Sequence, residues 1–297
     1  MVRYRRQDAI TMWEESTFGA LRVVREIAPV DIGYGRSLRR FVGVNDEAST
    51  AHLLYCMALG RMGSSRRRFI EAASEGASMA AHVLPIEAFS LDLKRGGVIV
   101  TPFVGDAGGL VTLGGLLAAK NGRMPVPEVR RALTHLLEGL ESIHRAGLVD
   151  GALGIERCLV DTRGRIRLEL PGMGWLLARR PGHAGELARQ DVRTIAEIGL
   201  TLCTGVLAGR DGASPTTIER RVARAPEPLR RWLILALSPL DGFATPGEAL
   251  RVLREICEHA PPAKVEASVP PVGVLRGLWG RVFGAGARAA DSRRTGT

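Results

Sequence analysis

The apolar residues follow two different patterns along the chain, and the change falls near residue 105. Before that point, short apolar runs are separated by turn residues, which is typical of β-strands. These runs predict strands over 39–44, 51–59, 83–89 and 98–103, with one helix over 66–81. After it, apolar residues recur about every 3.6 positions, as in amphipathic helices. This periodicity predicts helices over 127–146, 191–204, 229–237 and 246–259.

Two short extended runs interrupt the helical half. Residues 158–160 and 166–168 are predicted strands, separated by a turn signal that begins at Asp161. The pattern therefore predicts an α+β protein, with a small β-rich part followed by a larger helical part. We divide the chain into a charged lead-in (1–21), a β-rich segment (22–106), a helical segment (107–260), and a linker and tail rich in proline, glycine and arginine (261–297).

The composition narrows the classes of function. The 297 residues carry a net charge of +10, but aromatic residues are only 5% of the chain and do not alternate with basic ones, which favours a solvated arginine-rich surface over a nucleic-acid partner. No apolar stretch approaches the ~20 residues of a membrane span, and the N-terminus lacks the apolar core of a signal peptide. The four cysteines form no CxxC pair, which argues against structural zinc. We expect a cytoplasmic protein.

Few of the common enzyme motifs have a counterpart in the sequence. There is no HExxH, GxSxG or Walker A run. Gly33 and Gly35 form a GxG, which is a candidate for a phosphate-binding loop, but a hairpin turn explains these glycines equally well. Lysine is scarce, so a mechanism that needs one has only three candidates: Lys94, Lys120 and Lys264.

The most specific pattern lies where the helix predicted over 127–146 ends. Its residues are Ile143-His144, Gly147-Leu148-Val149, Leu153, Glu156 and Leu159-Val160-Asp161. This spacing resembles the catalytic-loop region of bacterial serine/threonine protein kinases of the Hanks type. In that family a long helix ending in an IHxxG(I/L)VH run leads into HRDLKPEN and then a short strand.

The similarity extends beyond this loop. It continues through Gly164 to Leu168 into the place of the DFG motif, and it resumes at Asp191 to Gly205, which resembles the D(I/V)xSLGxxLxxxxTG helix of the family. The resemblance covers roughly residues 22–258. It implies a bilobal protein-kinase-like fold, with a β-rich N-lobe over 22–106 and a helical C-lobe over 107–260.

In this alignment, other residues replace those that kinases need for phosphoryl transfer. The position of the catalytic base is Ala152, which has no acceptor, and the lysine two residues later is Gly154. The asparagine that binds a metal ion is Arg157, whose charge repels a dication. The aspartate of DFG is Leu170, whereas its glycine is kept as Gly172. The resemblance therefore implies a chain without catalytic base or metal ligands.

Acidic neighbours offer substitutes for the lost groups, and each has a simpler explanation. Making Asp150 the base shifts the alignment by one turn, which puts Ile155 at the metal-ligand position and moves the flanking apolar residues out of register. Glu169 alternates with Leu170 on a predicted strand, so its side chain faces the opposite way. Asp161 fits a turn residue.

We predict that Arg157 fills the former metal site and pairs with Glu156 or Glu169. The nucleotide side lacks its lysine as well, since the strand predicted over 51–59 contains none. In the next helix, Glu71 and Glu75 are candidates for that lysine's glutamate partner, but a solvated helix face explains them without it. We expect no cofactor and no binding of ATP with Mg²⁺.

Other conserved features of the kinase fold have mixed counterparts. Asp191 matches the aspartate that ties its helix to the backbone of the catalytic loop, although an N-cap role is equally consistent. His144 is expected to pack or to cap its helix. The segment from Leu170 to Asp191 is short and has no APE motif, and Gly242 stands near the place of the arginine that pairs with the APE glutamate.

These replacements imply a pseudokinase, an inactive protein-kinase homologue that acts as a regulatory or scaffold interaction module. Two alternatives stay open. One is a noncanonical kinase-like phosphotransferase, and the other is a regulator that binds a nucleotide or small ligand in the old ATP cleft.

The tail offers a candidate interaction segment. Leu275, Trp279 and Phe283 fall on one face of a helix, together with other apolar residues and beside arginines. Such a face suits the groove of a protein partner or an anionic membrane surface. Packing of the tail against the helical lobe is an equal alternative. We therefore expect a protein partner, with peripheral membrane contact through the tail as an addition.

Overall fold

The first part of the chain forms a six-stranded antiparallel sheet in the computed structural model, with strand order β1-β2-β3-β4-β6-β5. The structure describes residues 17–59, 63–77, 81–92, 96–106, 109–178, 184–205, 215–238 and 242–258. The strands of the sheet are β1 (Thr17–Phe18), β2 (Leu21–Gly33), β3 (Arg36–Asn45), β4 (Thr50–Met57), β5 (Ala88–Asp92) and β6 (Gly96–Pro102). One helix, α2 (Gly63–Ala77), packs against the sheet through Phe69, which is fully buried.

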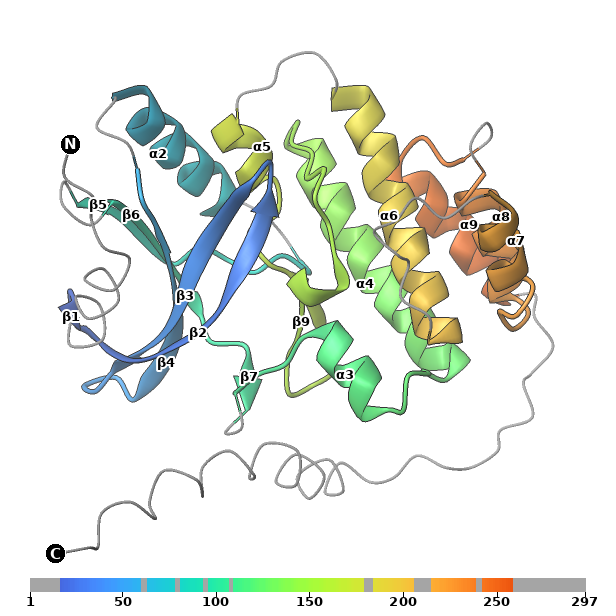
Figure 1. Ribbon diagram of the computed structural model, residues 1–297, viewed down its shortest axis with the longest axis horizontal. Helices are drawn as coiled ribbons and strands as arrows, with labels where there is room; N and C mark the ends of the chain where they lie inside the picture. The colour runs from blue at the N-terminus through green and yellow to red at the C-terminus, as the bar shows by residue number, and fades with distance from the viewer. Residues whose placement is uncertain are drawn as a thin grey trace, which may run out of the picture.

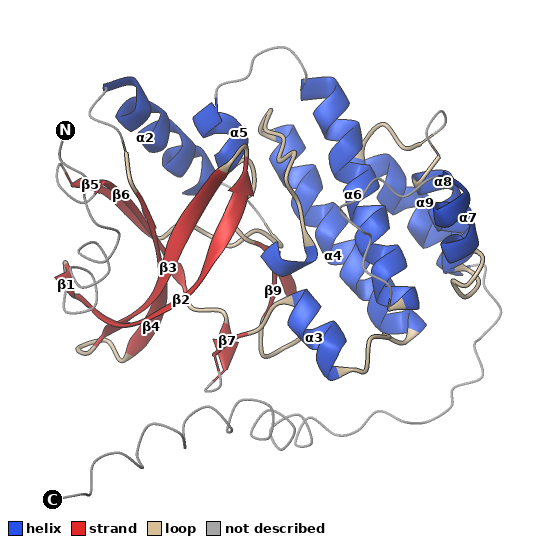
Figure 2. Ribbon diagram, viewed as in Figure 1, coloured by secondary structure: helices blue, strands red, loops and turns tan. Residues whose placement is uncertain are grey.

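The second part is mainly helical (Figure 2). Its helices are α3 (Leu113–Ala119), α4 (Val126–Arg145), α5 (Met173–Ala178), α6 (Ala184–Thr204), α7 (Pro215–Val222), α8 (Leu229–Ala236) and α9 (Pro246–Glu258). Two small antiparallel sheets accompany them, made of β7 (Gly105–Asp106) with β8 (Gly109–Leu110), and of β9 (Cys158–Val160) with β10 (Ile166–Leu168). The molecule therefore has a β-rich lobe and a helical lobe, as the sequence predicts (Figure 1).

Helix α4 forms the centre of the helical lobe. Its apolar stripe is fully buried at Val129, Leu133, Leu136, Leu137, Leu140 and Ile143. Helices α6 and α9 both pack against α4. The approach of α6 is close, because a Cβ on Gly199 would overlap the side chain of Leu133. Burial of this apolar stripe fixes the position of α4 in the lobe, and the loop that follows α4 therefore starts from a fixed place.

Residues 83–89 differ from the predicted strand. Only Ala88 and Phe89 belong to a sheet strand, β5, whereas Leu84 donates its N–H to the carbonyl of Leu168 at 2.9 Å. Leu168 in turn donates to the carbonyl of His82 at 2.8 Å. Pro85 has no N–H to donate, so the segment cannot continue a regular ladder. Its first residues instead pair with β10 in the helical lobe, whereas Glu87 donates its N–H to the carbonyl of Val100 in the large sheet.

The other predicted elements are found with small shifts, except that α6 begins at Ala184 rather than at 191. No helix in the described part of the chain is long and apolar enough to cross a membrane. The predicted lead-in falls almost entirely outside the described residues, as do the linker and tail with Leu275, Trp279 and Phe283.

Candidate functional site

The loop between α4 and β9 is held by a side chain from the middle of α6. Asp191 is buried, and its two carboxylate oxygens accept the backbone N–H groups of Asp150 at 2.8 Å and Gly151 at 2.7 Å. His144, at the end of α4, lies 3.3 Å from the same carboxylate. Because Asp191 lies seven residues inside α6, the alternative of an N-cap is wrong. The aspartate ties α6 to the loop backbone.

The centre of the loop is a buried ion pair. The Asp150 carboxylate receives both terminal nitrogens of Arg157, with Nη1 2.6 Å from Oδ1 and Nη2 3.1 Å from Oδ2. The same carboxylate accepts the backbone N–H groups of Ala152 and Gly172, each at 3.0 Å. The Asp150 and Arg157 side chains are only 1% and 6% exposed, so water cannot substitute for either partner.

Arg157 also fastens the loop to the segment after β10. Its Nη2 donates to the carbonyls of Glu169 at 2.9 Å and Leu170 at 3.0 Å, and its Nη1 donates to the carbonyl of Ala152 at 2.9 Å. Burial opposes the charge of this guanidinium, but the Asp150 carboxylate outweighs that effect and holds the pKa of Arg157 above its usual value. The arginine therefore stays charged and joins the positions that the kinase alignment assigns to base and metal.

The predicted partner of Arg157 was wrong. Glu156 accepts the hydroxyl of Thr112 at 2.8 Å instead, at the start of α3. Glu169 offers Arg157 its carbonyl, while its carboxylate turns to the other lobe. The actual partner, Asp150, occupies the alignment position of the histidine in HRD. Opposite charges at two positions of one motif are a sequence signal that would have suggested this pair.

A second buried charge cluster joins the two lobes. Glu169 is 0% exposed, and its carboxylate accepts Nη1 of Arg40 on β3 at 2.9 Å and the hydroxyl of Tyr55 on β4 at 2.7 Å. Arg40 also donates through Nε to the carbonyl of Ala28 on β2. Burial and the neighbouring Glu169 carboxylate raise the pKa of Tyr55 well above its ordinary value, so the phenol remains a donor.

Arg40 and Tyr55 were not identified from the sequence. Tyr55 lies in the strand that should carry the phosphate-binding lysine, and its side chain points into the same apolar cluster as Leu53 and Leu170. Leu170 is 2% exposed there and adopts a positive φ of 44°. Arg40 is followed by Phe41 in an ordinary strand pattern, and no local signal links it to a carboxylate 129 residues away.

The turn between β2 and β3 lies directly on the catalytic-loop position. Gly33, Tyr34 and Gly35 form this turn, so the hairpin interpretation of the GxG describes it. A Cβ on Gly33 would overlap the Cβ of Ala152, and a Cβ on Gly151 would come near the Tyr34 hydroxyl. In Figure 1 the tip of this hairpin approaches α5. The tip of the hairpin therefore packs directly on Gly151 and Ala152.

The remaining predicted site residues lie around this core. Gly172 has a φ of 73° and directs its N–H to Asp150. Gly154 precedes the 3₁₀ turn η1 (Ile155–Arg157), and its carbonyl accepts the N–H of Arg157 at 2.9 Å. Glu71 is exposed and pairs with Arg67 on the surface of α2. Asp161 accepts backbone N–H groups of its own turn, as expected for a turn residue.

The side chains at this site do not fit a magnesium nucleotide. Ala152 and Leu170 have no oxygen ligand to offer, and the Arg157 guanidinium is a fixed positive charge. Among the described residues, no three histidine, cysteine, aspartate or glutamate side chains are grouped as metal ligands would be. What this arrangement provides chemically is a set of buried charged hydrogen bonds that join the loop to α6 and to the segment after β10, and that segment to the β-rich lobe.

Comparison with solved structures identifies the fold. The kinase domain of PknI from Mycobacterium tuberculosis superposes with a TM-score of 0.60 at 20% sequence identity, covering 82% of this chain and 98% of that one. The Drosophila melanogaster PAN3 pseudokinase gives a TM-score of 0.63 at 13% identity, covering 91% and 72%. PAN3 of Neurospora crassa, solved in complex with PAN2, gives 0.58 at 13% identity, covering 98% and 75%.

The chain therefore has a protein-kinase-like fold, with neighbours that include both a kinase domain and pseudokinases. A comparison with protein-family models finds no match, and neither does a comparison with curated protein sequences.

Proposed function

We propose that the chain is a pseudokinase, a protein-kinase-like domain without phosphotransferase activity, which acts as a regulatory or scaffold module. The observation that supports this most directly is the Arg157 network. Its guanidinium bonds to the carbonyls of Ala152 and Leu170 and to the Asp150 carboxylate, at the positions where kinases hold a base and metal ions. A fixed positive charge at this place repels Mg²⁺. The metal ions that would neutralise the transferred phosphoryl group therefore cannot bind there.

The size of the expected loss can be judged from single-group effects. Removal of one stabilising group from a preorganised transfer site costs about 10²–10³-fold in rate. Here the base is replaced by Ala152, and the two metal ligands are replaced by Arg157 and Leu170. The phosphate-binding lysine is missing from β4, where Tyr55 or a neighbouring residue takes its place. Groups that act as a unit are not additive, but the absence of all of them leaves no recognised route to transfer.

Nucleotide binding and transfer are the direct test. Thermal-shift measurements and titration calorimetry with ATP, each with Mg²⁺, Mn²⁺ or EDTA, are expected to show no metal-dependent binding, and labelled ATP is expected to transfer no phosphate. Inorganic triphosphate at matched ionic strength controls for attraction to the basic surface. Metal-dependent binding with transfer would overturn the proposal. Saturable nucleotide binding without transfer would favour the alternative of a nucleotide-regulated module.

The interaction role is proposed for the tail, residues 262–297. Deleting it is expected to leave the melting temperature of the kinase-like domain nearly unchanged and to abolish sedimentation with phosphatidylserine vesicles or binding to a protein partner. Neutral phosphatidylcholine vesicles are the matched control. A fall of several degrees in melting temperature on deletion would instead show that the tail packs on the folded domain.

A further inference from the structure

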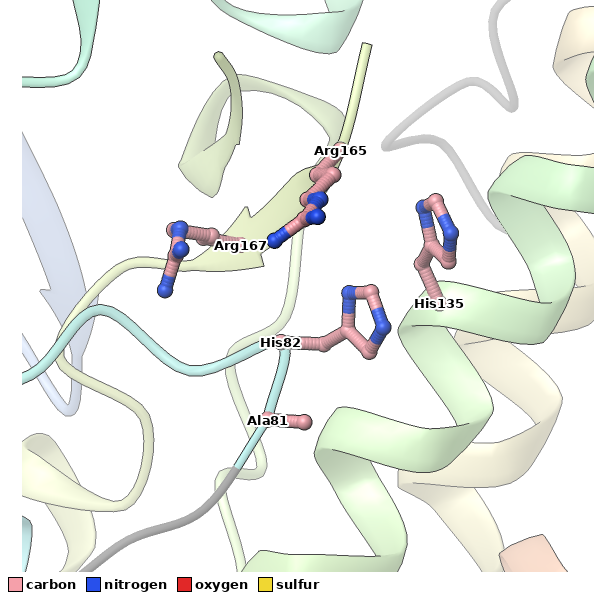
Figure 3. Close-up of a pocket in the computed structure, with 5 residues that line it drawn as sticks. All are labelled: Ala81, His82, His135, Arg165 and Arg167. Atoms are coloured by element: carbon pink, nitrogen blue, oxygen red, sulfur yellow. The ribbon is translucent and has the colours of Figure 1, made fainter. Parts of the chain in front are cut away.

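A basic cavity lies on a different part of the helical lobe from the remodelled catalytic loop. It has a volume of about 330 Å³ and is lined by Ala81, His82, His135, Arg165 and Arg167. His135 projects from α4, the two arginines come from the β9–β10 hairpin, and His82 comes from the segment after α2 (Figure 3). Three separate parts of the chain thus contribute basic side chains to the lining of one cavity, with the Arg167 guanidinium on the side away from the imidazole rings in Figure 3.

Backbone hydrogen bonds fix the two imidazole rings. They stack at 4.1 Å between centroids, with only 15° between their planes. His82 Nδ1 lies 2.9 Å from the Ile166 carbonyl and so carries a proton, whereas His135 Nδ1 accepts the Ile166 N–H at 3.3 Å. A neutral His135 must then carry its proton on Nε2. In the described part of the chain, this Nε2–H has no protein acceptor, so it is free to donate to a ligand.

The two arginines add strong donors to the same cavity. Arg165 immediately precedes β10 and Arg167 lies within it, and both side chains extend to the same side of the hairpin in Figure 3. Within the described ranges, neither guanidinium forms an ion pair. Arg131 stands one helical turn before His135 on α4 and contributes further positive potential.

The acidic groups nearby are already engaged. Glu138 lies 3.3 Å from His82 Nε2 and is bonded to Arg254 at 2.8 Å. Asp161 accepts the backbone N–H groups of Arg163 and Arg165, at 2.9 Å each. The electrostatic potential in the cavity is therefore positive. In accord with this, burial together with the nearby His82 and basic side chains lowers the pKa of His135 to about 4.

We propose that this cavity binds a phosphate group, either as free phosphate or as the phosphomonoester of a small molecule. The planar donor forks of Arg165 and Arg167 match phosphate oxygens, and His135, which lines the other side of the cavity, has an Nε2–H left to donate. The volume is at the lower end of the range for small-molecule sites, so it accommodates a carrier group beside the phosphate.

Titration of the full chain with inorganic phosphate and with O-phosphoserine tests the site and separates the two sources. Histidine NMR at pH 7 is expected to show saturable shifts of His135 and His82 with both ligands, and serine is expected to produce none. A bound dianion also favours the protonated imidazole, so the pKa of His135 is expected to rise from about 4 when ligand is saturating. Tighter binding of phosphoserine than of phosphate would indicate a small-molecule phosphomonoester.

Variants of the hairpin distinguish a specific site from general attraction. Arg165→Gln removes a lining charge, and Arg163→Gln removes an equal charge from the exposed turn of the same hairpin. Loss of one charge-assisted contact is expected to weaken phosphate binding by roughly tenfold in Arg165→Gln, with less than about a twofold change in Arg163→Gln. Arg167→Gln provides a second lining variant, with the same expected weakening.

Two outcomes overturn the proposal. One is an equal effect of the Arg163→Gln and Arg165→Gln substitutions on affinity. The other is an unchanged His135 signal while the chain binds phosphate elsewhere.

Discussion

Replacement of Arg157 by methionine is the sharpest test of the remodelled loop. The substitution keeps an apolar stem of similar reach but removes the charge that faces Asp150. It leaves a carboxylate that is 1% exposed without its counter-ion, and it takes a donor from the carbonyls of Ala152, Glu169 and Leu170. Breaking a buried pair from one side costs about 3–5 kcal/mol. That is a large part of the ~5–15 kcal/mol that holds a typical domain folded.

Urea unfolding followed by circular dichroism and tryptophan fluorescence measures this loss as a change in the free energy of unfolding. Arg145→Met is the matched control, because Arg145 pairs with Glu141 at 2.9 Å on the surface with its side chain 75% exposed. That pair is expected to contribute less than about 0.5 kcal/mol.

A double variant isolates the charge effect. Asp150→Asn combined with Arg157→Met removes both charges, while the amide oxygen still accepts a backbone N–H. We expect the double variant to be more stable than Arg157→Met alone by at least ~1 kcal/mol. The reasoning is refuted if Arg157→Met costs no more than Arg145→Met, or if adding Asp150→Asn lowers stability further.

Three further substitutions have definite expected outcomes. Ala152→Asp is expected to give no phosphotransfer from labelled ATP, because the metal-ligand positions remain leucine and arginine; measurable transfer would show that the kinase alignment is wrong. Tyr55→Phe is expected to cost about 1.5–3 kcal/mol in urea unfolding, since the buried Glu169 carboxylate loses a donor; a cost below ~0.5 kcal/mol would contradict this. The folded pKa of His135, about 4, lies below its ordinary 6.5, so the unfolded chain takes up the proton first and stability falls as the pH drops from 6.5 towards 4. His135→Gln is expected to reduce that fall in melting temperature, and parallel pH curves for the two proteins would count against it.

The lobes and most of their elements could be predicted because their signals are local. The stripe of α4 repeats at the helical period over its whole length, and the β9–β10 hairpin is marked by a turn whose aspartate caps its own backbone. The start of α6 was missed because residues 184–190 contain only one large apolar residue, Leu187, and therefore show no apolar period. Residues 83–87 have strand-like composition, but Val83 and Leu84 pair with β10, and only Glu87 bonds to the large sheet, through the carbonyl of Val100.

The candidate site was only half predictable for a similar reason. The assignment of Ala152, Arg157 and Leu170 to the positions of base and metal ligands rests on a motif alignment that one sequence can supply, and it stays a prediction. The partners of buried charges depend on how distant segments meet. Arg40 finds its carboxylate partner, Glu169, only when folding brings β3 against the segment after β10. Burial of a charge selects for a partner, but the sequence does not say which acidic residue provides it.

The Arg40–Glu169 pair also determines how the two lobes can move. A hinge rotation that opened them would separate a carboxylate and a guanidinium whose side chains are 0% and 8% exposed, with no solvent in place to receive either charge. The contact of the β2–β3 turn with Ala152 would be lost in the same motion. We therefore expect this pair to suppress the microsecond-to-millisecond closure that is typical of two-lobed enzymes. A partner that spans both lobes meets a surface already in its final geometry, and it can bind without the entropy loss of ordering it.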